Sequence, residues 1–130
     1  MREIKFRVWD KETKRLFVLG DGHDTFMFLP SGASYYNLQN GSGGDDYDLM
    51  QFTGLNDKTG KEIFEGDICT GMFYPGKSSS QLTYSVEFLD GGFQFINIHD
   101  STDGHWFSEF LHDSIEVIGN IYETPELLTR

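Results

Sequence analysis

The chain has 130 residues, a length typical of one domain, and its 21 acidic and 10 basic side chains give a formal net charge of -11. A 15% aromatic content excludes a disordered acidic tail, and no apolar run reaches the roughly 18–20 residues that cross a bilayer. The start MREIKFRVWD lacks the pattern of a secretory leader, and a single cysteine, Cys69, cannot form an internal disulfide. We therefore expect a soluble, cytoplasmic, acidic protein forming one domain over residues 1–130.

The first predicted element is a strand at residues 4–9, where apolar side chains alternate with others. The face that we expect to be buried carries Ile4, Phe6 and Val8. The outer face carries Lys5, Arg7 and Trp9. Residues 10–15 predict a polar turn and residues 16–19 the returning strand, so that 1–20 form a hairpin packing on a β body at 49–122. Because Trp and Arg concentrate binding energy at protein interfaces, the outer face is the predicted contact surface.

The central part of the chain predicts a second hairpin. Residues 20–48 contain a short apolar run at 26–29 and a loop rich in Gly, Asn and Asp at 37–48. Strands are predicted at 49–55 and 62–64, joined by a turn in which Gly60 takes a positive φ. A tight turn at 65–68 then leads into another strand, of which Ile68 is the first inward residue.

The last third of the chain follows a loop at 70–82. Strands are predicted at 82–88 and 93–98, with a turn at 90–92, followed by a polar loop at 99–106 and one or two helical turns at 107–112. A final strand at 115–122 carries Gly119 as a bulge, and the Thr-Pro-Glu sequence from Thr124 predicts a short C-terminal helix. About eight strands without a crossover helix indicate a mainly β fold, either a small barrel or packed antiparallel sheets.

The acidic charge is distributed unevenly along the sequence. Residues 1–15 hold six basic and three acidic groups, a balance of +3, whereas residues 16–130 hold four basic and 18 acidic groups, a balance of -14. Nucleic-acid binding relies on Lys and Arg to neutralise phosphates, so this composition disfavours it. Complementary surfaces within or between subunits are the expected consequence, and we predict a homo-oligomer.

Several strings, in order along the chain, resemble those of the YopX family of bacteriophage and prophage proteins. They are KFRVWD at 5–10, MQFTGLNDKTGKEI at 50–63, EGDI at 65–68, VEFLDGGF at 86–93 and EVIGNIYETPELL at 116–128. The resemblance implies a mostly β fold with an SH3-like barrel element around residues 65–68, and a phage or prophage product working in a bacterial cytoplasm. It implies no catalytic residues, cofactor or substrate.

Two alternatives to a binding protein are kept open. One is a metal-dependent hydrolase or nuclease, because imidazoles and carboxylates lie at short spacing in His99, Asp103, His105 and His112. The other is an acidic decoy that mimics nucleic acid and occupies a host protein, which the balance of -14 motivates. The leading hypothesis is a non-enzymatic β-barrel interaction module without a cofactor, which self-associates and takes a host or phage protein as a further partner.

Overall fold

The structure, a computed structural model, describes residues 3–18, 24–29, 32–37, 47–72, 82–110 and 114–129. The chain divides into two compact units, Met1–Phe52 and Thr53–Arg130. The prediction of a single domain at 1–130, with a first hairpin at 1–20 on a body at 49–122, stays a prediction. No helix among the described residues is both long and apolar enough to cross a membrane.

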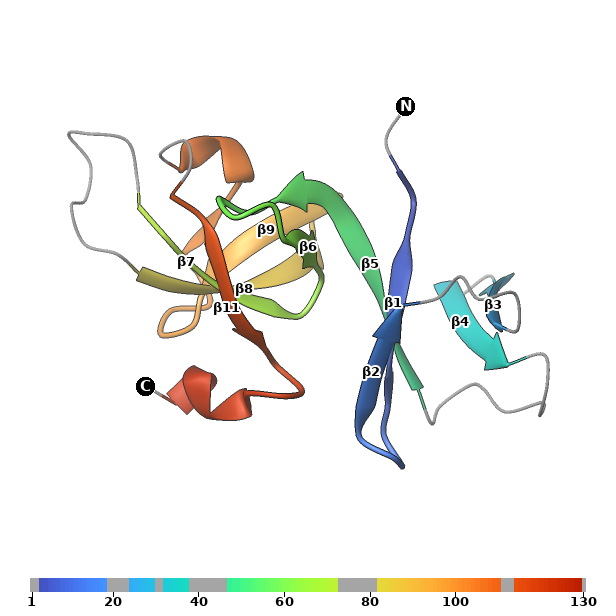
Figure 1. The fold of residues 1–130 in the computed structure, drawn as a ribbon. Coiled ribbons are helices and arrows are strands. Elements are labelled where there is room, and N and C mark those ends of the chain that lie inside the picture. Colours follow the sequence, from blue (N-terminus) through green and yellow to red (C-terminus); the bar gives the residue numbers. More distant parts are fainter. Residues whose placement is uncertain are drawn as a thin grey trace. The chain divides into compact units, whose positions relative to one another are not determined.

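The first unit is built from antiparallel strands (Figure 1). β1 (Phe6–Asp10) pairs on one edge with β2 (Arg15–Val18) and on the other with the first half of β5 (Tyr47–Asn56). β1 is therefore a central strand, and β2 lies at the edge of the sheet. A separate two-stranded sheet joins β3 (Asp24–Leu29) to β4 (Gly32–Asn37).

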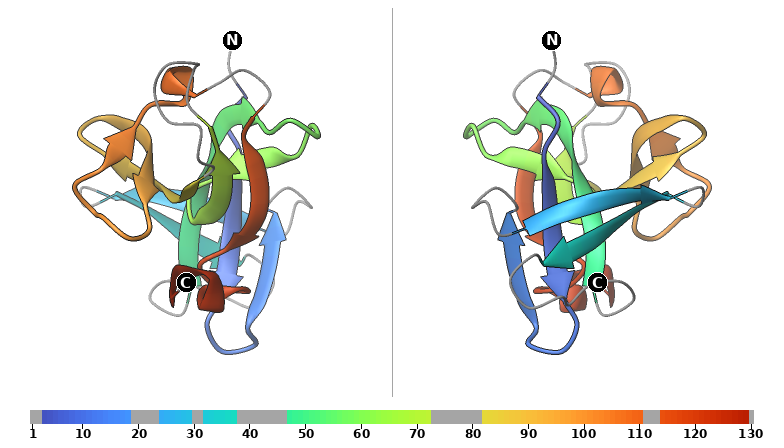
Figure 2. Two further views of the ribbon diagram at one scale, coloured as in Figure 1. Left: turned by 90° about the vertical axis from the view of Figure 1, so that its left-hand side faces the viewer. Right: turned by 90° about the vertical axis from the view of Figure 1, so that its right-hand side faces the viewer.

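The second unit contains the end of β5 and a five-stranded antiparallel sheet in the order β10-β9-β8-β7-β11. The strands of this sheet are β7 (Asp67–Gly71), β8 (Leu82–Leu89), β9 (Gly92–Asn97), β10 (Gly104–His105) and β11 (Glu116–Asn120). A further strand, β6 (Glu62–Phe64), pairs with β5. The 3-10 helices η2 (Phe107–Glu109) and η3 (Pro125–Thr129) lie near opposite ends of β11 (Figure 1). The sheet curls strongly into a half-barrel, as Figure 2 shows.

The core of the second unit lies inside this curl. It consists of Ile63, Cys69, Tyr84, Val86, Phe95, Phe110 and Ile115. The Phe110 ring meets the rings of Tyr84 and Phe95 edge to face, with centroids 5.1 and 5.3 Å apart, an arrangement that aromatic quadrupoles favour. Alternate residues of β8 and β9 supply this face, as the period-two pattern of the sequence predicts.

The turn between β5 and β6 is built around the buried carboxylate of Asp57. Its Oδ1 accepts hydrogen bonds from the Thr59 N–H, the Thr59 hydroxyl and the Lys61 N–H at 2.8, 2.7 and 2.9 Å. Its Oδ2 accepts the Val117 N–H of β11 at 2.9 Å. Burial alone would raise the pKa of Asp57, but these hydrogen bonds outweigh it and hold the pKa below its usual value.

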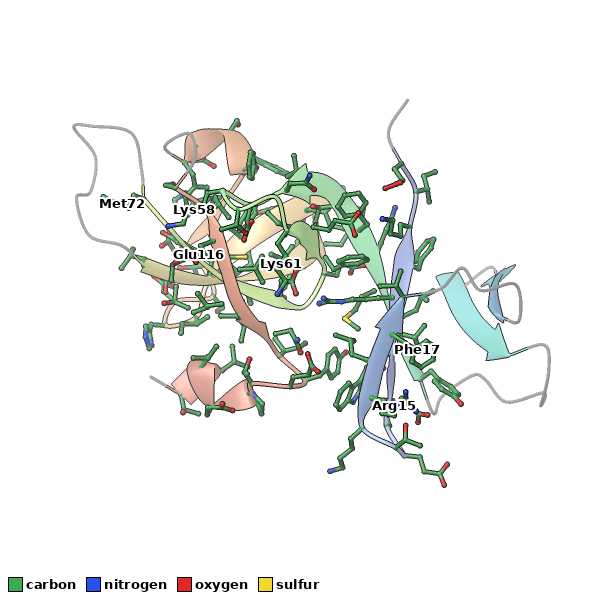
Figure 3. The ribbon with its side chains drawn as sticks, in the orientation of Figure 1. Arg15, Phe17, Lys58, Lys61, Met72 and Glu116 are labelled. Carbon is green, nitrogen blue, oxygen red and sulfur yellow. The ribbon has the colours of Figure 1, made fainter. Side chains whose placement is uncertain are left out.

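An ion pair reinforces the link between this turn and β11. The Lys58 ammonium lies 3.3 Å from the Glu116 carboxylate, and both side chains are partly exposed (Figure 3). The Lys58 N–H also donates to the Ile115 carbonyl at 2.8 Å. The hairpin turn is thus joined to a strand about 60 residues later in the chain by a carboxylate, a backbone hydrogen bond and a surface ion pair.

The structure confirms the mainly β, antiparallel prediction and several details of the turns. Gly60 has a φ of 90°, and the register of β11 shifts between Val117 and Gly119, as expected for a bulge. The predicted C-terminal helix is a 3-10 helix, and the predicted polar loop at 99–106 contains the two-residue strand β10. The predicted loop residues 38–46 and 73–81 lie outside the described residues. Ile4 is 63% exposed, so its predicted burial is wrong; β1 begins only at Phe6.

Candidate functional site

The predicted outer face of the first strand is not an open surface. Arg7 is buried, with 6% of its surface exposed, and Trp9 is half-buried. The Lys5 ammonium lies 5.3 Å from the centre of the Phe52 ring and 3.2 Å from the Glu3 carboxylate. The expectation that Arg7 faces solvent is therefore wrong, because alternation along a strand separates two faces without showing that either is uncovered. The interface role of Lys5, Arg7 and Trp9 stays a prediction.

The exposed cations of the first hairpin lie at its turn and at the start of β2. Lys11, Lys14 and Arg15 are all exposed, and Figure 3 shows Arg15 at the end of β2 next to the turn. Asp10 closes the turn: its Oδ1 accepts the Glu12 and Thr13 N–H groups at 3.0 and 3.2 Å, and its carbonyl accepts the Lys14 N–H at 2.8 Å. We call Lys11, Lys14 and Arg15 the cationic turn.

The pKa of Asp10 reflects this arrangement. Desolvation is the largest single influence and would raise it, but the hydrogen bonds from Thr13 and Glu12 and the positive charge of Arg15 together outweigh it and lower the pKa. Asp10 therefore stays ionised and keeps the turn closed at neutral pH. The hydrogen bonds to Asp10 define the backbone conformation of the cationic turn.

The described members of the predicted metal set, His99, Asp103 and His105, do not form a metal site. His105 Nε2 lies 2.6 Å from Asp103 Oδ1, while His105 Nδ1 lies 3.2 Å from Glu109 Oε1, so the two carboxylates are on opposite sides of the ring. His99 is exposed and its N–H donates to Asn97 Oδ1, and His112 lies outside the described residues. Within the described ranges no three His, Cys, Asp or Glu residues are arranged to hold a metal ion.

The Asp103–His105–Glu109 cluster instead positions the residue beside it. Glu109 Oε2 accepts the backbone N–H of Trp106 at 2.7 Å while its other oxygen contacts His105. Asp103 Oδ2 accepts the Asn97 side-chain amide at 3.1 Å, which ties the cluster to the end of β9. These contacts hold the backbone at Trp106 in place.

Tyr84 lies against the same cluster from β8. Its ring meets the His105 ring edge to face, with centroids 5.9 Å apart. Burial, together with the negative charges of Asp103 and Glu109, raises the pKa of Tyr84 to about 12. The phenol is therefore neutral at physiological pH and is not available there as a base.

An exposed apolar surface lies where β8 and β9 meet. The two strands are joined by Asp90 and Gly91, with φ values of 52° and 85°, as a type I′ turn requires. Beside this turn, Phe88, Leu89 and Trp106 are 52%, 41% and 46% exposed. Such large apolar side chains normally lie inside a protein, and their grouping at one end of a hairpin is typical of a binding surface.

The side chains at this end of the hairpin lie on its two faces, because Phe88 and Leu89 are successive residues of β8 and Gly92 pairs with Leu89. Phe88 pairs with Phe93 across the strands, and their rings meet edge to face at 5.1 Å. The Trp106 ring covers Gly92 so closely that a β-carbon there would lie 2.7 Å from Cζ3 of the ring. We call Phe88, Leu89, Phe93 and Trp106, with Asp90 at the turn, the aromatic end.

Comparison with known proteins identifies the family. The YopX protein family matches residues 5–129 of the chain. The chain belongs to the YopX family. This confirms the resemblance found in the sequence, whereas a phage origin stays a prediction.

Two solved structures resemble the chain over nearly its whole length. The crystal structure of protein EF1440 from Enterococcus faecalis is 28% identical, with a TM-score of 0.62 over 98% of this chain and 99% of that one. The structure of YopX from Bacillus subtilis is 24% identical, with a TM-score of 0.62 over 98% and 97% of the two chains, and so supports the fold alone. No curated protein matches the chain.

The YopX-like strings of the sequence are turns and strands rather than parts of one site. Asp57 builds the β5–β6 turn, and Asp67 accepts the Phe64 N–H at 2.8 Å within the EGDI string. Asn120 accepts the N–H groups of Tyr122 and Glu123 at 3.0 and 2.8 Å and so shapes the connection to η3. The structural role of these side chains is to accept backbone hydrogen bonds. The motif strings therefore indicate a shared fold and do not indicate a catalytic reaction.

Sequence reasoning predicted the β8–β9 hairpin and missed the aromatic end. Trp106 lies 14 residues after Gly92 in the chain, in a stretch that read as a polar loop. The Gly91-Gly92 pair is the signal that could have found it, because a glycine within a strand often marks the close approach of another group. The sequence alone does not show which group approaches.

Proposed function

We propose that this YopX-family protein is a non-enzymatic interaction module that associates with itself, and that its aromatic end forms part of the contact. The observation that carries this proposal is the exposure of Phe88, Leu89 and Trp106 at one end of the β8–β9 hairpin, next to a well-packed core. Aromatic residues dominate the energy of protein interfaces, and each of these three would lose much of its water contact on association.

The geometry of the polar groups supports binding over catalysis. Both ring nitrogens of His105 face carboxylates that accept other hydrogen bonds, from the Asn97 amide and from the backbone N–H of Trp106, and Tyr84 is a neutral phenol. Cys69 is wholly buried in the core of the second unit. A nucleophile and base within reach of each other and of solvent would favour an enzyme.

Light scattering coupled to size-exclusion chromatography tests this proposal. We expect a mass above the 14.9 kDa of one chain at concentrations up to about 100 µM, a range that covers the dissociation constants of functional complexes. The variants Phe88→Ser and Trp106→Ser should return the mass toward one chain. Ile118→Ser is the matched control, since Ile118 on β11 is equally apolar and 40% exposed but lies outside the aromatic end.

Two results would contradict the proposal. One is a wild-type protein that stays at the mass of one chain throughout this range. The other is an oligomer that Phe88→Ser and Trp106→Ser leave unchanged, because the contact would then lie elsewhere on the molecule.

A further inference from the structure

We propose that the contact joins unlike surfaces: the cationic turn of one copy lies against the aromatic end of a second copy. This inference rests on the self-association proposed above and names what the aromatic end binds. Each copy then offers one surface of each kind, so that association is head to tail.

Charge complementarity points to this occupant. The 52 residues from 78 to 129 contain nine acidic residues and neither Lys nor Arg, and this stretch includes the whole aromatic end. Asp90 and Glu87 are exposed beside its apolar side chains. Six of the ten basic residues of the protein lie within residues 1–15. The first hairpin is therefore the most basic segment available to an acidic surface of this chain.

The individual charges at the two surfaces can take new partners. Within the described parts of the chain, neither Lys14 nor Asp90 forms an ion pair, and both are exposed. Lys11 already contacts Asp48 at 3.4 Å, as a partly exposed pair of small energetic value. Lys14 and Arg15 are thus the cations that a second copy can engage most directly.

The chemistry of the two side-chain types matches. A guanidinium stacks on the face of a Trp or Phe ring, and the aliphatic stems of Lys and Arg cover apolar surface while their charges stay in water. Arg15 over Trp106, which lies on the same face of the hairpin as Leu89 and Glu87, with its charge near Asp90, would satisfy both requirements at once.

Both turns have a backbone conformation that is defined by hydrogen bonds or by the turn type. Asp10 closes the cationic turn through three hydrogen bonds, and a type I′ turn closes the β8–β9 hairpin. Rigid surfaces lose little conformational entropy when they bind, which raises affinity without additional contacts.

Contacts between like surfaces are disfavoured by the same charges. Two aromatic ends would bring Asp90 and Glu87 against their copies, and two cationic turns would bring Lys14 and Arg15 against theirs. A head-to-tail contact avoids both repulsions and produces either a closed ring or an open chain. The net charge of -11 repels copies at long range, but this repulsion is screened beyond about 8 Å at physiological salt.

A mixing experiment tests the pairing directly. Arg15→Glu disables the cationic turn and keeps the aromatic end, whereas Trp106→Lys disables the aromatic end and keeps the cationic turn. We expect each variant alone to bind itself about tenfold or more weakly than wild type. Mixed together, they should form a 1:1 complex by light scattering, because one intact surface of each kind remains.

Lys61→Glu is the matched charge control for Arg15→Glu. It makes the same change of two charge units at an exposed position of the β5–β6 turn, and it should leave association unchanged. Circular dichroism and a thermal melt verify that each variant is folded. Arg15→Gln and Leu89→Ser serve as a second pair if Arg15→Glu or Trp106→Lys melts below wild type.

The outcomes separate the two proposals. A wild-type protein that remains a single chain refutes self-association itself. An oligomer that Arg15→Glu leaves intact, or a mixture of the two weakened variants that stays at the mass of one chain, refutes only the head-to-tail pairing. Raising salt from about 0.1 M to 1 M, which shortens the screening length from about 10 Å to 3 Å, should weaken wild-type association; strengthening would count against the pairing.

Discussion

Replacing Asp57 with alanine should destabilise the second unit more than any other single carboxylate change at a turn. The side chain is 7% exposed and accepts four hydrogen bonds, three from the turn and one from Val117 on β11. Hydrogen bonds to a charged acceptor contribute about 1.5–3 kcal/mol each, but water replaces those of the exposed Thr59 and Lys61. We therefore expect a loss of about 2–4 kcal/mol, dominated by the Val117 N–H.

Asp57→Asn keeps the shape of the side chain and removes its charge. The amide keeps one oxygen for the turn donors, but its NH2 group then faces the Val117 N–H, so that two donors oppose each other. The expected loss is about 1–3 kcal/mol, smaller than for alanine.

The assay is urea unfolding followed by Trp106 fluorescence in a Trp9→Phe background, so that only the second unit is observed. Asp100→Ala is the matched control, because Asp100 accepts the same two hydrogen bonds from Thr102, at 3.0 and 2.6 Å, in an exposed turn. Its carboxylate has no counterpart, among the described residues, of the bond that Asp57 accepts from Val117. The control should leave the unfolding midpoint nearly unchanged. If Asp57→Ala lowers the midpoint no more than Asp100→Ala does, the stabilisation does not come from the link to β11.

The dependence on pH provides a second check. Because the folded-state pKa of Asp57 is below its ordinary value of 3.8, the folded state binds fewer protons than the unfolded state as this group titrates. Its contribution is fully present above about pH 4 and is lost as the pH falls through the folded-state pKa. The difference between wild type and Asp57→Asn should therefore shrink below about pH 4. A difference that stays constant down to pH 2 would contradict this reasoning.

Three further changes have defined outcomes. Tyr84→Phe should remove an absorbance change near pH 12 from a phenolate titration; loss of a change near pH 10 instead would show that Tyr84 is not buried beside charge. Glu109→Ala should red-shift Trp106 emission, because the backbone N–H of Trp106 loses its acceptor and the indole becomes more exposed to water. An unchanged spectrum would mean that the cluster does not hold Trp106 in place. Gly119→Ala should cost about 1–3 kcal/mol in a thermal melt, since a β-carbon there would collide with the Thr124 hydroxyl; a wild-type melting temperature would show that η3 moves away freely.

The turns were the most predictable part of the fold, because their chemistry is local. An Asp followed three residues later by Gly predicted the β5–β6 turn, and Gly60 does take a positive φ. Asp90-Gly91 predicted the β8–β9 hairpin, and both residues have positive φ. The pair β3 and β4 was not predicted, since neither the apolar run at 26–29 nor residues 32–37 has a period-two pattern.

The surfaces were less predictable, because exposure depends on what lies across from a face. Lys5, Arg7 and Trp9 share a face, but Arg7 is buried on a strand with neighbours at both edges. His105 lies near two carboxylates, as its sequence neighbourhood suggested, but they approach from opposite sides of the ring. Sequence spacing predicts that such groups lie near one another. It does not predict the direction from which they approach.

The boundary between the two units falls between Phe52 and Thr53, in the middle of β5 rather than in a linker. The first half of β5 pairs with β1, and Thr53 in the second half donates its hydroxyl to the Ile63 carbonyl at 2.7 Å. Fraying of this one strand therefore removes hydrogen bonds from both units, which couples their unfolding. Each unit holds one tryptophan, Trp9 or Trp106, so single-tryptophan proteins can show whether the two halves of the chain melt in one cooperative step.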